Sequence, residues 1–125
     1  MQNNIVRYGV LSTANIALKR LLPAARESSN SEVVGISSRD QSKARAVAED
    51  LDIPTWYGSY DELIADPDLH AVINPLPNSM HCAWTIKAAE AGKHILCEKP
   101  LAVTTDEVRR MIASAKANNV VLVEA

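Results

Sequence analysis

Residues 9–17, which read GVLSTANIA, have the composition of a phosphate-binding turn between a strand and a helix. In a dinucleotide-binding fold this turn is rich in glycine, so that a pyrophosphate can approach the backbone amides at the helix N-terminus. Against the pattern GxxGxGxxA, Gly9 and Ala17 match, whereas Ser12 and Ala14 stand at glycine positions. Both replacements are small, so a phosphate can still approach at some steric cost. The turn indicates a nucleotide site, but an ordinary strand-to-helix turn of an unrelated α/β protein fits these residues equally well.

A second polar group, Ser37-Ser38-Arg39-Asp40, follows another apolar run. NAD-selective folds often hold an acidic residue at the end of the second strand, where it binds the ribose hydroxyls. If Ser38 takes that position, nothing repels a 2′-phosphate, and Arg39 can pair with it through charge-assisted hydrogen bonds. This interpretation favours NADP over NAD. Two alternatives stay open: Arg39 and Lys43 as ordinary surface cations, and Asp40 as the ribose ligand after a slip of one residue.

The elements that must position these residues follow from the periodicity of the chain. Short apolar runs alternate with longer segments of helical period, a pattern typical of parallel strands joined by crossover helices. The expected strands are residues 5–11, 32–37, 55–57, 71–74, 94–97 and 120–124, and the expected helices are 16–27, 42–51, 61–65, 81–91 and 105–118. The predicted fold class is α/β: one Rossmann-type domain with a doubly wound parallel sheet, three layers, and strand order 3-2-1-4-5-6.

Strand interiors and helix ends carry further signals. Residues 33–36 and 120–123 are apolar almost throughout. Because strands covered on both faces lose their alternation, both runs are expected in the interior of the sheet. Ser59 and Thr104 each stand three residues before a glutamate, the spacing of a capped helix start. Gly92 follows the fourth expected helix, where a left-handed residue would end it.

Composition limits the classes of function. The 125 residues are 47% hydrophobic and 22% charged, as in soluble globular domains, and the formal net charge of -2 argues against nucleic acid or an anionic membrane as the main partner. No apolar run is long enough to span a bilayer, and the first residues lack the features of a secretory signal, so the expected location is cytoplasmic. Cys82 and Cys97 lack the spacing of a metal site and are expected to be reduced core thiols.

Two later segments carry a resemblance to a known family. Residues 71–81 read AVINPLPNSMH, and residues 88–101 read AAEAGKHILCEKPL. They resemble the PNxxH and GKHVxxEKP segments of the Gfo/Idh/MocA oxidoreductase family, named for glucose-fructose oxidoreductase and inositol dehydrogenase. In that family the PNxxH segment follows the fourth strand, and the GKHVxxEKP segment includes the fifth strand. Both segments occur here in the same order and at the expected separation. The similarity extends over nearly the whole chain. In their detailed sequence, the motifs most resemble those of the family's sugar and dihydrodiol dehydrogenases.

The resemblance implies roles for individual residues. Lys99 matches the family's lysine that reaches the substrate hydroxyl and assists proton transfer as hydride moves to or from the nicotinamide. Glu98 matches a residue near the nicotinamide ribose, and Pro100 a proline that often follows a cis peptide bond. For His81, a structural role and a contact with the cofactor both stay open. The complete set of expected cofactor-binding residues is Gly9, Ser12, Thr13, Ala14, Asn15, Ile16, Ser38, Arg39, Lys43, Pro75, Leu76, Pro77, Asn78, His81, Glu98, Lys99 and Pro100.

The resemblance also implies a two-domain enzyme, in which an α/β domain with an open sheet follows the Rossmann domain and covers the nicotinamide. We expect residues 1–125 to be the first domain alone, with the substrate-binding domain absent from this chain. The expected function is nicotinamide dinucleotide binding within an NAD(P)-dependent oxidoreductase that acts, when complete, on a sugar or related cyclic polyol. Two alternatives are a non-catalytic dinucleotide-binding module and the family's NAD-dependent glycoside hydrolase branch.

Overall fold

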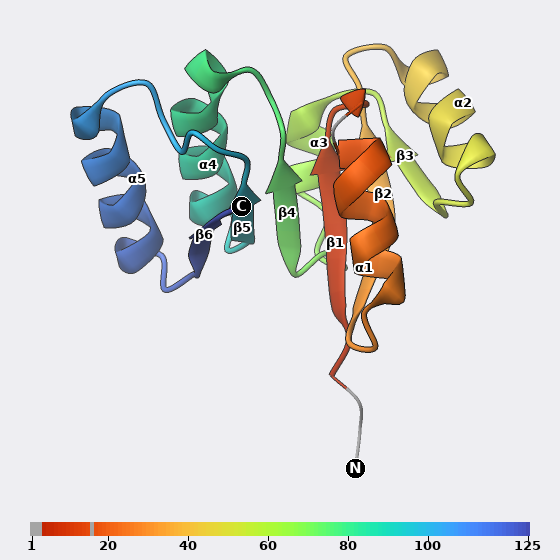
Figure 1. Ribbon diagram of the computed structural model, residues 1–125, viewed down its shortest axis with the longest axis horizontal. Helices are drawn as coiled ribbons and strands as arrows, with labels where there is room; N and C mark the ends of the chain where they lie inside the picture. The colour runs from red at the N-terminus through yellow and green to blue at the C-terminus, as the bar shows by residue number, and fades with distance from the viewer. Residues whose placement is uncertain (1–3, 16) are drawn as a thin grey trace.

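The computed structural model describes residues 4–15 and 17–125. Its strands form a six-stranded sheet in the order β3-β2-β1-β4-β5-β6, with every neighbouring pair parallel (Figure 1). They are β1 (Val6–Leu11), β2 (Ser31–Ser37), β3 (Thr55–Tyr57), β4 (Ala71–Asn74), β5 (His94–Cys97) and β6 (Leu122–Glu124). The predicted fold class and strand order are confirmed.

The connections between strands are helical. They are η1 (Ala17–Leu21), α1 (Leu22–Glu27), α2 (Gln41–Asp50), α3 (Tyr60–Ile64), η2 (Asn78–Met80), α4 (His81–Glu90) and α5 (Thr105–Ala117). The expected single helix over residues 16–27 is divided, because η1 is a π-helical turn that gives way to α1 with a proline in its first turn. Pro23 has no N–H to donate to the preceding turn, so a regular α-helical ladder cannot continue through it. No described helix has the length and apolar character that crossing a membrane requires.

The core lies in two clusters, one on each face of the sheet. The larger packs α3, α4 and α5 against the sheet through residues such as Leu63, Val72 and Met111. The smaller packs η1, α1 and α2 against the other face and includes Val10 and Ile73. Successive residues of β4, Val72 and Ile73, thus enter opposite clusters, as the alternation of side chains along a strand requires. The sheet is therefore the middle of three layers.

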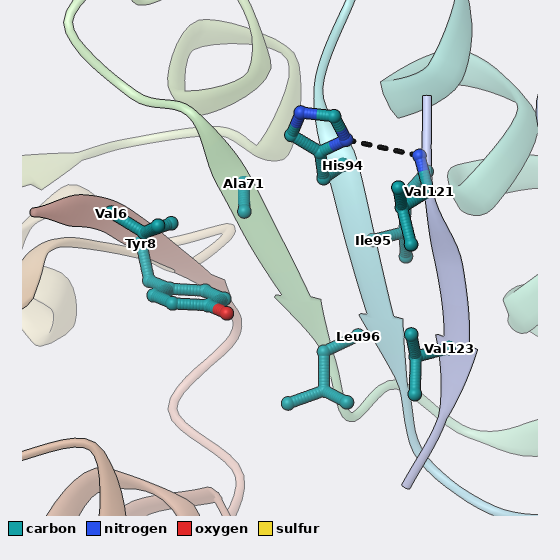
Figure 2. A pocket seen from close by; sticks show the side chains of 8 residues that line it. All are labelled: Val6, Tyr8, Ala71, His94, Ile95, Leu96, Val121 and Val123. Carbon is teal, nitrogen blue, oxygen red and sulfur yellow. Dashed lines mark hydrogen bonds between the residues drawn. The ribbon is translucent and has the colours of Figure 1, made fainter. Parts of the chain in front are cut away.

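One expectation for the sheet is wrong: residues 120–123 do not lie in its interior. β6 is an edge strand, and Val121 and Val123 are 58% and 48% exposed. In the described part of the chain, the helices of the smaller core cluster come before β3, and they leave the β4–β6 side of that face open. Figure 2 shows the resulting groove of about 370 Å³, which is lined by Val6, Tyr8, Ala71, His94, Ile95, Leu96, Val121 and Val123.

The predicted helix ends are confirmed. The Ser59 Oγ accepts a hydrogen bond from the Glu62 N–H at 3.1 Å, and the Thr104 Oγ1 accepts one from the Glu107 N–H at 3.2 Å. Gly92 ends α4 with a φ of +79°, a conformation that glycine adopts without steric penalty. These local signals determine where α3 and α5 begin and where α4 ends. They therefore also help to position the loops that precede these helices at the carboxyl edge of the sheet.

Candidate functional site

A polar pocket lies where the loops after β1, β2 and β4 meet. β1 and β4 are neighbours, and the chain leaves them toward opposite ends of the sheet (Figure 1). Open α/β sheets bind their ligands at such a switch point, outside the carboxyl ends of the strands. The pocket measures about 350 Å³ and is lined by Ser12, Thr13, Ala14, Asn15, Ser38, Arg39, Lys43, Tyr60, Pro75, Leu76 and Pro77. The structure thus brings together ten of the residues that sequence analysis expected to bind a cofactor.

The first turn keeps a glycine-like backbone without its glycine. Ser12 has a φ of +112°, which glycine adopts freely and which costs another residue about 1–3 kcal/mol. Two hydrogen bonds hold it there: the Ser12 N–H donates to the Val10 carbonyl, and its Oγ accepts from the Ala14 N–H, both at 3.2 Å. The serine therefore preserves the turn that the glycine pattern describes. Ile16, also expected at this site, lies outside the described residues.

The turn after β2 orients cations toward the pocket. Ser38 is buried, and its Oγ accepts a hydrogen bond from the Asp40 N–H at 3.2 Å. The Asp40 carboxylate in turn accepts from the Ser42 N–H at 2.9 Å and caps α2. Arg39 and Lys43 line the pocket, whereas Asp40 is engaged at the helix start. Among the described lining residues there are two cations and no carboxylate, an arrangement that favours a bound anion.

The residues after β5 lie one strand away from this pocket. The Glu98 N–H donates to the Asn74 carbonyl at 3.0 Å, which ties the end of β5 to the end of β4. The Glu98 carboxylate accepts a hydrogen bond from the Lys99 N–H at 2.9 Å. The Lys99–Pro100 peptide bond is cis, as the resemblance implied. The side chain of Lys99 is exposed, so it is free to meet a bound molecule at this edge.

Six expected residues do not line the pocket: Gly9, Asn78, His81, Glu98, Lys99 and Pro100. Gly9 lies within β1, where an added Cβ would come within 2.7 Å of Leu69 and 2.8 Å of Leu63. Gly9 therefore makes room for the core beneath α3. His81 is fully buried, and both of its ring nitrogens face backbone carbonyl oxygens. Its ring supports the loops from below and is not exposed to the pocket.

Sequence reasoning missed Tyr60, which lines the pocket as the first residue of α3. Its ring packs edge-on against Trp84 of α4, with ring centroids 5.2 Å apart. The only local signal was the capping residue Ser59 immediately before it. Tyr60 lies with Leu76 and Pro77 in the pocket lining because of the way α3 packs on the sheet. The spacing of residues along the chain does not specify that packing.

The two thiols near the site are expected to be unreactive in the folded chain. Burial raises the pKa of Cys97 to about 11 and also raises the pKa of Cys82. Because the thiolate is the reactive form, alkylation by iodoacetamide at pH 8 should be slow in buffer and fast in denaturant, as followed by intact mass. Modification of both cysteines in the folded chain at the rate of a free thiol would contradict this.

The parallel sheet, its switch-point pocket and the cationic turn after β2 define a dinucleotide-binding Rossmann domain. The family model described as "Oxidoreductase family, NAD-binding Rossmann fold" matches residues 6–125. The chain belongs to this family, the Gfo/Idh/MocA oxidoreductases. The resemblance inferred from the PLPNSMH and GKHILCEKP segments is confirmed.

Individual relatives agree with the family assignment. A D-xylose 1-dehydrogenase (NADP(+)) of Haloferax volcanii is 46% identical over 118 residues, which are 94% of this chain and 36% of that protein. The trans-1,2-dihydrobenzene-1,2-diol dehydrogenase of Bos taurus is 38% identical over 97% of this chain and 35% of its own length. A 3-ketoreductase from Actinomadura kijaniata, crystallised with NADP and TDP-benzene, superimposes with a TM-score of 0.91 at 35% identity, over 97% of this chain and 37% of that chain. The chain thus spans about a third of the length of these relatives.

Proposed function

We propose that this chain binds the dinucleotide of an NAD(P)-dependent oxidoreductase whose substrate is a sugar or a related cyclic polyol. The observation that carries the proposal is the pocket at the β1/β4 switch point, with small residues in its first turn and Arg39 and Lys43 at its side. Its volume of about 350 Å³ lies within the usual range of small-molecule sites. The names of the sugar and dihydrodiol dehydrogenases among the relatives support the substrate class.

Each part of the pocket suits a part of a dinucleotide. The turn at Ser12–Asn15 precedes a helix, so its backbone suits a pyrophosphate. Arg39 and Lys43 suit a 2′-phosphate, because guanidinium and ammonium groups form strong hydrogen bonds with phosphate oxygens. Pro75, Leu76 and Pro77 form a mainly apolar part of the pocket lining, which suits the nicotinamide ring. The bound cofactor would supply the hydride chemistry.

Lys99 is the residue we propose for proton transfer. When a hydroxyl gives up hydride it also gives up a proton, and a positioned side chain accelerates that transfer. The exposed side chain of Lys99 follows β5, next to the strand whose loop lines the pocket. The Glu98 carboxylate accepts from the Lys99 N–H and so fixes the backbone beside Lys99. From the family pattern, we propose Glu98 as the residue beside the nicotinamide ribose.

We further propose that the preferred cofactor is NADP. The Asp40 carboxylate caps α2, so the pocket wall formed by Ser38, Arg39 and Lys43 carries no acid to repel a 2′-phosphate. The D-xylose dehydrogenase is named for NADP(+), and the ketoreductase was crystallised with NADP, which supports this choice. NAD remains the alternative to be measured.

Arg39→Ala is expected to weaken NADPH binding about 10-fold to 100-fold, because a charge-assisted hydrogen bond contributes about 1.5–3 kcal/mol. NADH lacks the 2′-phosphate, so its affinity for the variant should be nearly unchanged. Isothermal titration of both cofactors decides the matter, with Arg45→Ala as the matched control. Arg45 is an exposed cation on α2, the helix that begins just after Arg39; it pairs with Glu49 and does not line the pocket. An unchanged ratio of the two affinities in Arg39→Ala would place the ribose site elsewhere.

A further inference from the structure

Tyr60 belongs both to the core of the chain and to the wall of the switch-point pocket. It is the first residue of α3 and lines the pocket together with the loops after β1, β2 and β4. It is also a member of the larger core cluster, and only 9% of its surface is exposed. The core therefore holds the residue in place, while the small part of its surface that stays open can meet a bound molecule.

The hydroxyl group of Tyr60 has no hydrogen-bond partner among the described residues. The hydroxyl of Tyr57, three residues earlier, donates to the Asp66 carboxylate. In the described part of the chain, no enclosed side-chain nitrogen or oxygen is left without a partner, so the unpartnered hydroxyl of Tyr60 must be accessible. A tyrosine that is buried to this extent usually finds a partner for its hydroxyl. A molecule in the pocket can supply that partner.

The ring of Tyr60 is held by α4. It packs edge-on against Trp84, with ring centroids 5.2 Å apart and an angle of 89° between the planes. The ammonium group of Lys87 lies 4.2 Å from the centroid of the Trp84 ring and 3.6 Å from the carboxylate of Asp61, the residue after Tyr60. These contacts connect the start of α3 to α4 and restrict rotation of the ring. A hydroxyl fixed in this way loses little conformational freedom when it binds a ligand.

The start of α3 lies beside the turn after β2. The Ser38 N–H donates a hydrogen bond to the Tyr57 carbonyl at 3.2 Å, which ties the end of β3 to this turn. A Cβ added to Gly58 would lie 3.1 Å from the Cβ of Gln41, the first residue of α2. Tyr60 therefore approaches the pocket from the side of the cationic turn.

The proposed function, on which this inference rests, places the 2′-phosphate of the cofactor at that turn, so the adenosine lies next to it. We propose that the Tyr60 hydroxyl opens into the pocket and forms a hydrogen bond with the uncharged part of the adenosine, its base or its ribose. A tyrosine hydroxyl can both donate and accept, and adenosine offers ring nitrogens, an amino group and hydroxyls. Because NADPH and NADH share this part, Tyr60 strengthens the binding of both, whereas Arg39 distinguishes them.

Tyr60→Phe removes a single oxygen atom and keeps the ring that packs against Trp84. Isothermal titration should show that NADPH, NADH and 2′,5′-ADP all bind about threefold to tenfold more weakly, the usual net contribution of one hydrogen bond. The ratio of the NADPH and NADH affinities should stay as it is in the unaltered chain. Tyr8→Phe is the matched control, because Tyr8 lines the apolar groove of Figure 2 and not the nucleotide pocket. It should leave all three affinities unchanged.

Each other pattern of affinities contradicts the proposal in a different way. Unchanged binding in Tyr60→Phe would show that the hydroxyl does not reach the ligand, and the proposed function would stand. A loss for NADPH and 2′,5′-ADP but not for NADH would assign the hydroxyl to the 2′-phosphate. A loss for both dinucleotides but not for 2′,5′-ADP would assign it to the nicotinamide half. If the unaltered chain binds none of the three, the proposed function fails and this inference fails with it.

A crystal structure of the unaltered chain with 2′,5′-ADP gives a direct test that does not depend on how a variant folds. The Tyr60 hydroxyl oxygen should lie about 2.5–3.0 Å from a nitrogen or oxygen atom of the base or ribose. A bound adenosine whose base and ribose make no hydrogen bond with this hydroxyl would overturn the proposal.

Discussion

Gly9→Val should lower the free energy of unfolding by about 3 kcal/mol, a large fraction of the stability of a small domain. The position has no room for a side chain, because a Cβ would lie 2.7 Å from Leu69 and 2.8 Å from Leu63. Those two side chains are 3% and 0% exposed, so they have nowhere to move. Overpacking of this kind forces side chains out of their preferred rotamers. Chemical denaturation followed by circular dichroism measures the loss.

Two further variants separate overpacking from other causes. Gly92→Ala meets no atom within 4 Å, but its φ of +79° is unfavourable for alanine and should cost only about 1 kcal/mol. Gly9→Ala should destabilise the chain less when Leu63→Ala has already opened the space, as a double-mutant cycle would show. If Gly9→Val leaves stability unchanged and abolishes NADPH binding, the glycine serves the nucleotide directly, as the turn pattern first suggested.

The elements of this fold could be predicted because the signals for them are local. Alternating apolar runs and capping residues such as Ser59 and Thr104 act within a few positions, and right-handed crossovers then restrict the order of the strands. The error at residues 120–123 has a physical cause. An apolar run favours a strand that is covered on both faces, but it does not show which elements, if any, cover each face. In the described chain β6 lies at the edge, where Val121 and Val123 are exposed.

The site was predictable where backbone conformation or charge is a property of one turn. Ser12 holds a glycine-like φ, and Arg39 lines the pocket, both at positions that follow directly from a strand end. Tyr60 and the two contacts of His81 depend on how separate crossovers pack, so spacing along the chain did not predict them. The roles of Lys99 and Glu98 stay predictions that rest on the family pattern.

The 125-residue chain by itself is expected to bind cofactor but to oxidise sugars at least about 10⁵-fold more slowly than a complete enzyme of its family. Holding two reactants in line contributes effective concentrations of about 10⁵–10⁸ M, and we propose that these residues form only one side of such a site. Lys99 is exposed, and among the described residues its ammonium group makes no hydrogen bond or ion pair. The relatives are about three times as long, and we propose that their additional residues hold the substrate against the nicotinamide.

The assay follows nicotinamide absorbance with a panel of aldoses and cyclitols, using purified chain and Lys99→Ala as the matched control. Calorimetric binding of NADPH by both proteins shows that the pocket is formed, so a lack of turnover cannot be attributed to unfolding. Binding should persist in the variant, because Lys99 does not line the pocket that we propose for the phosphates. Turnover by the unaltered chain at rates typical of enzymes, lost in Lys99→Ala, would show that these residues form a complete active site. In that case the substrate would have to bind within the loops after β4 and β5, and the proposal that a second domain supplies the site would be wrong.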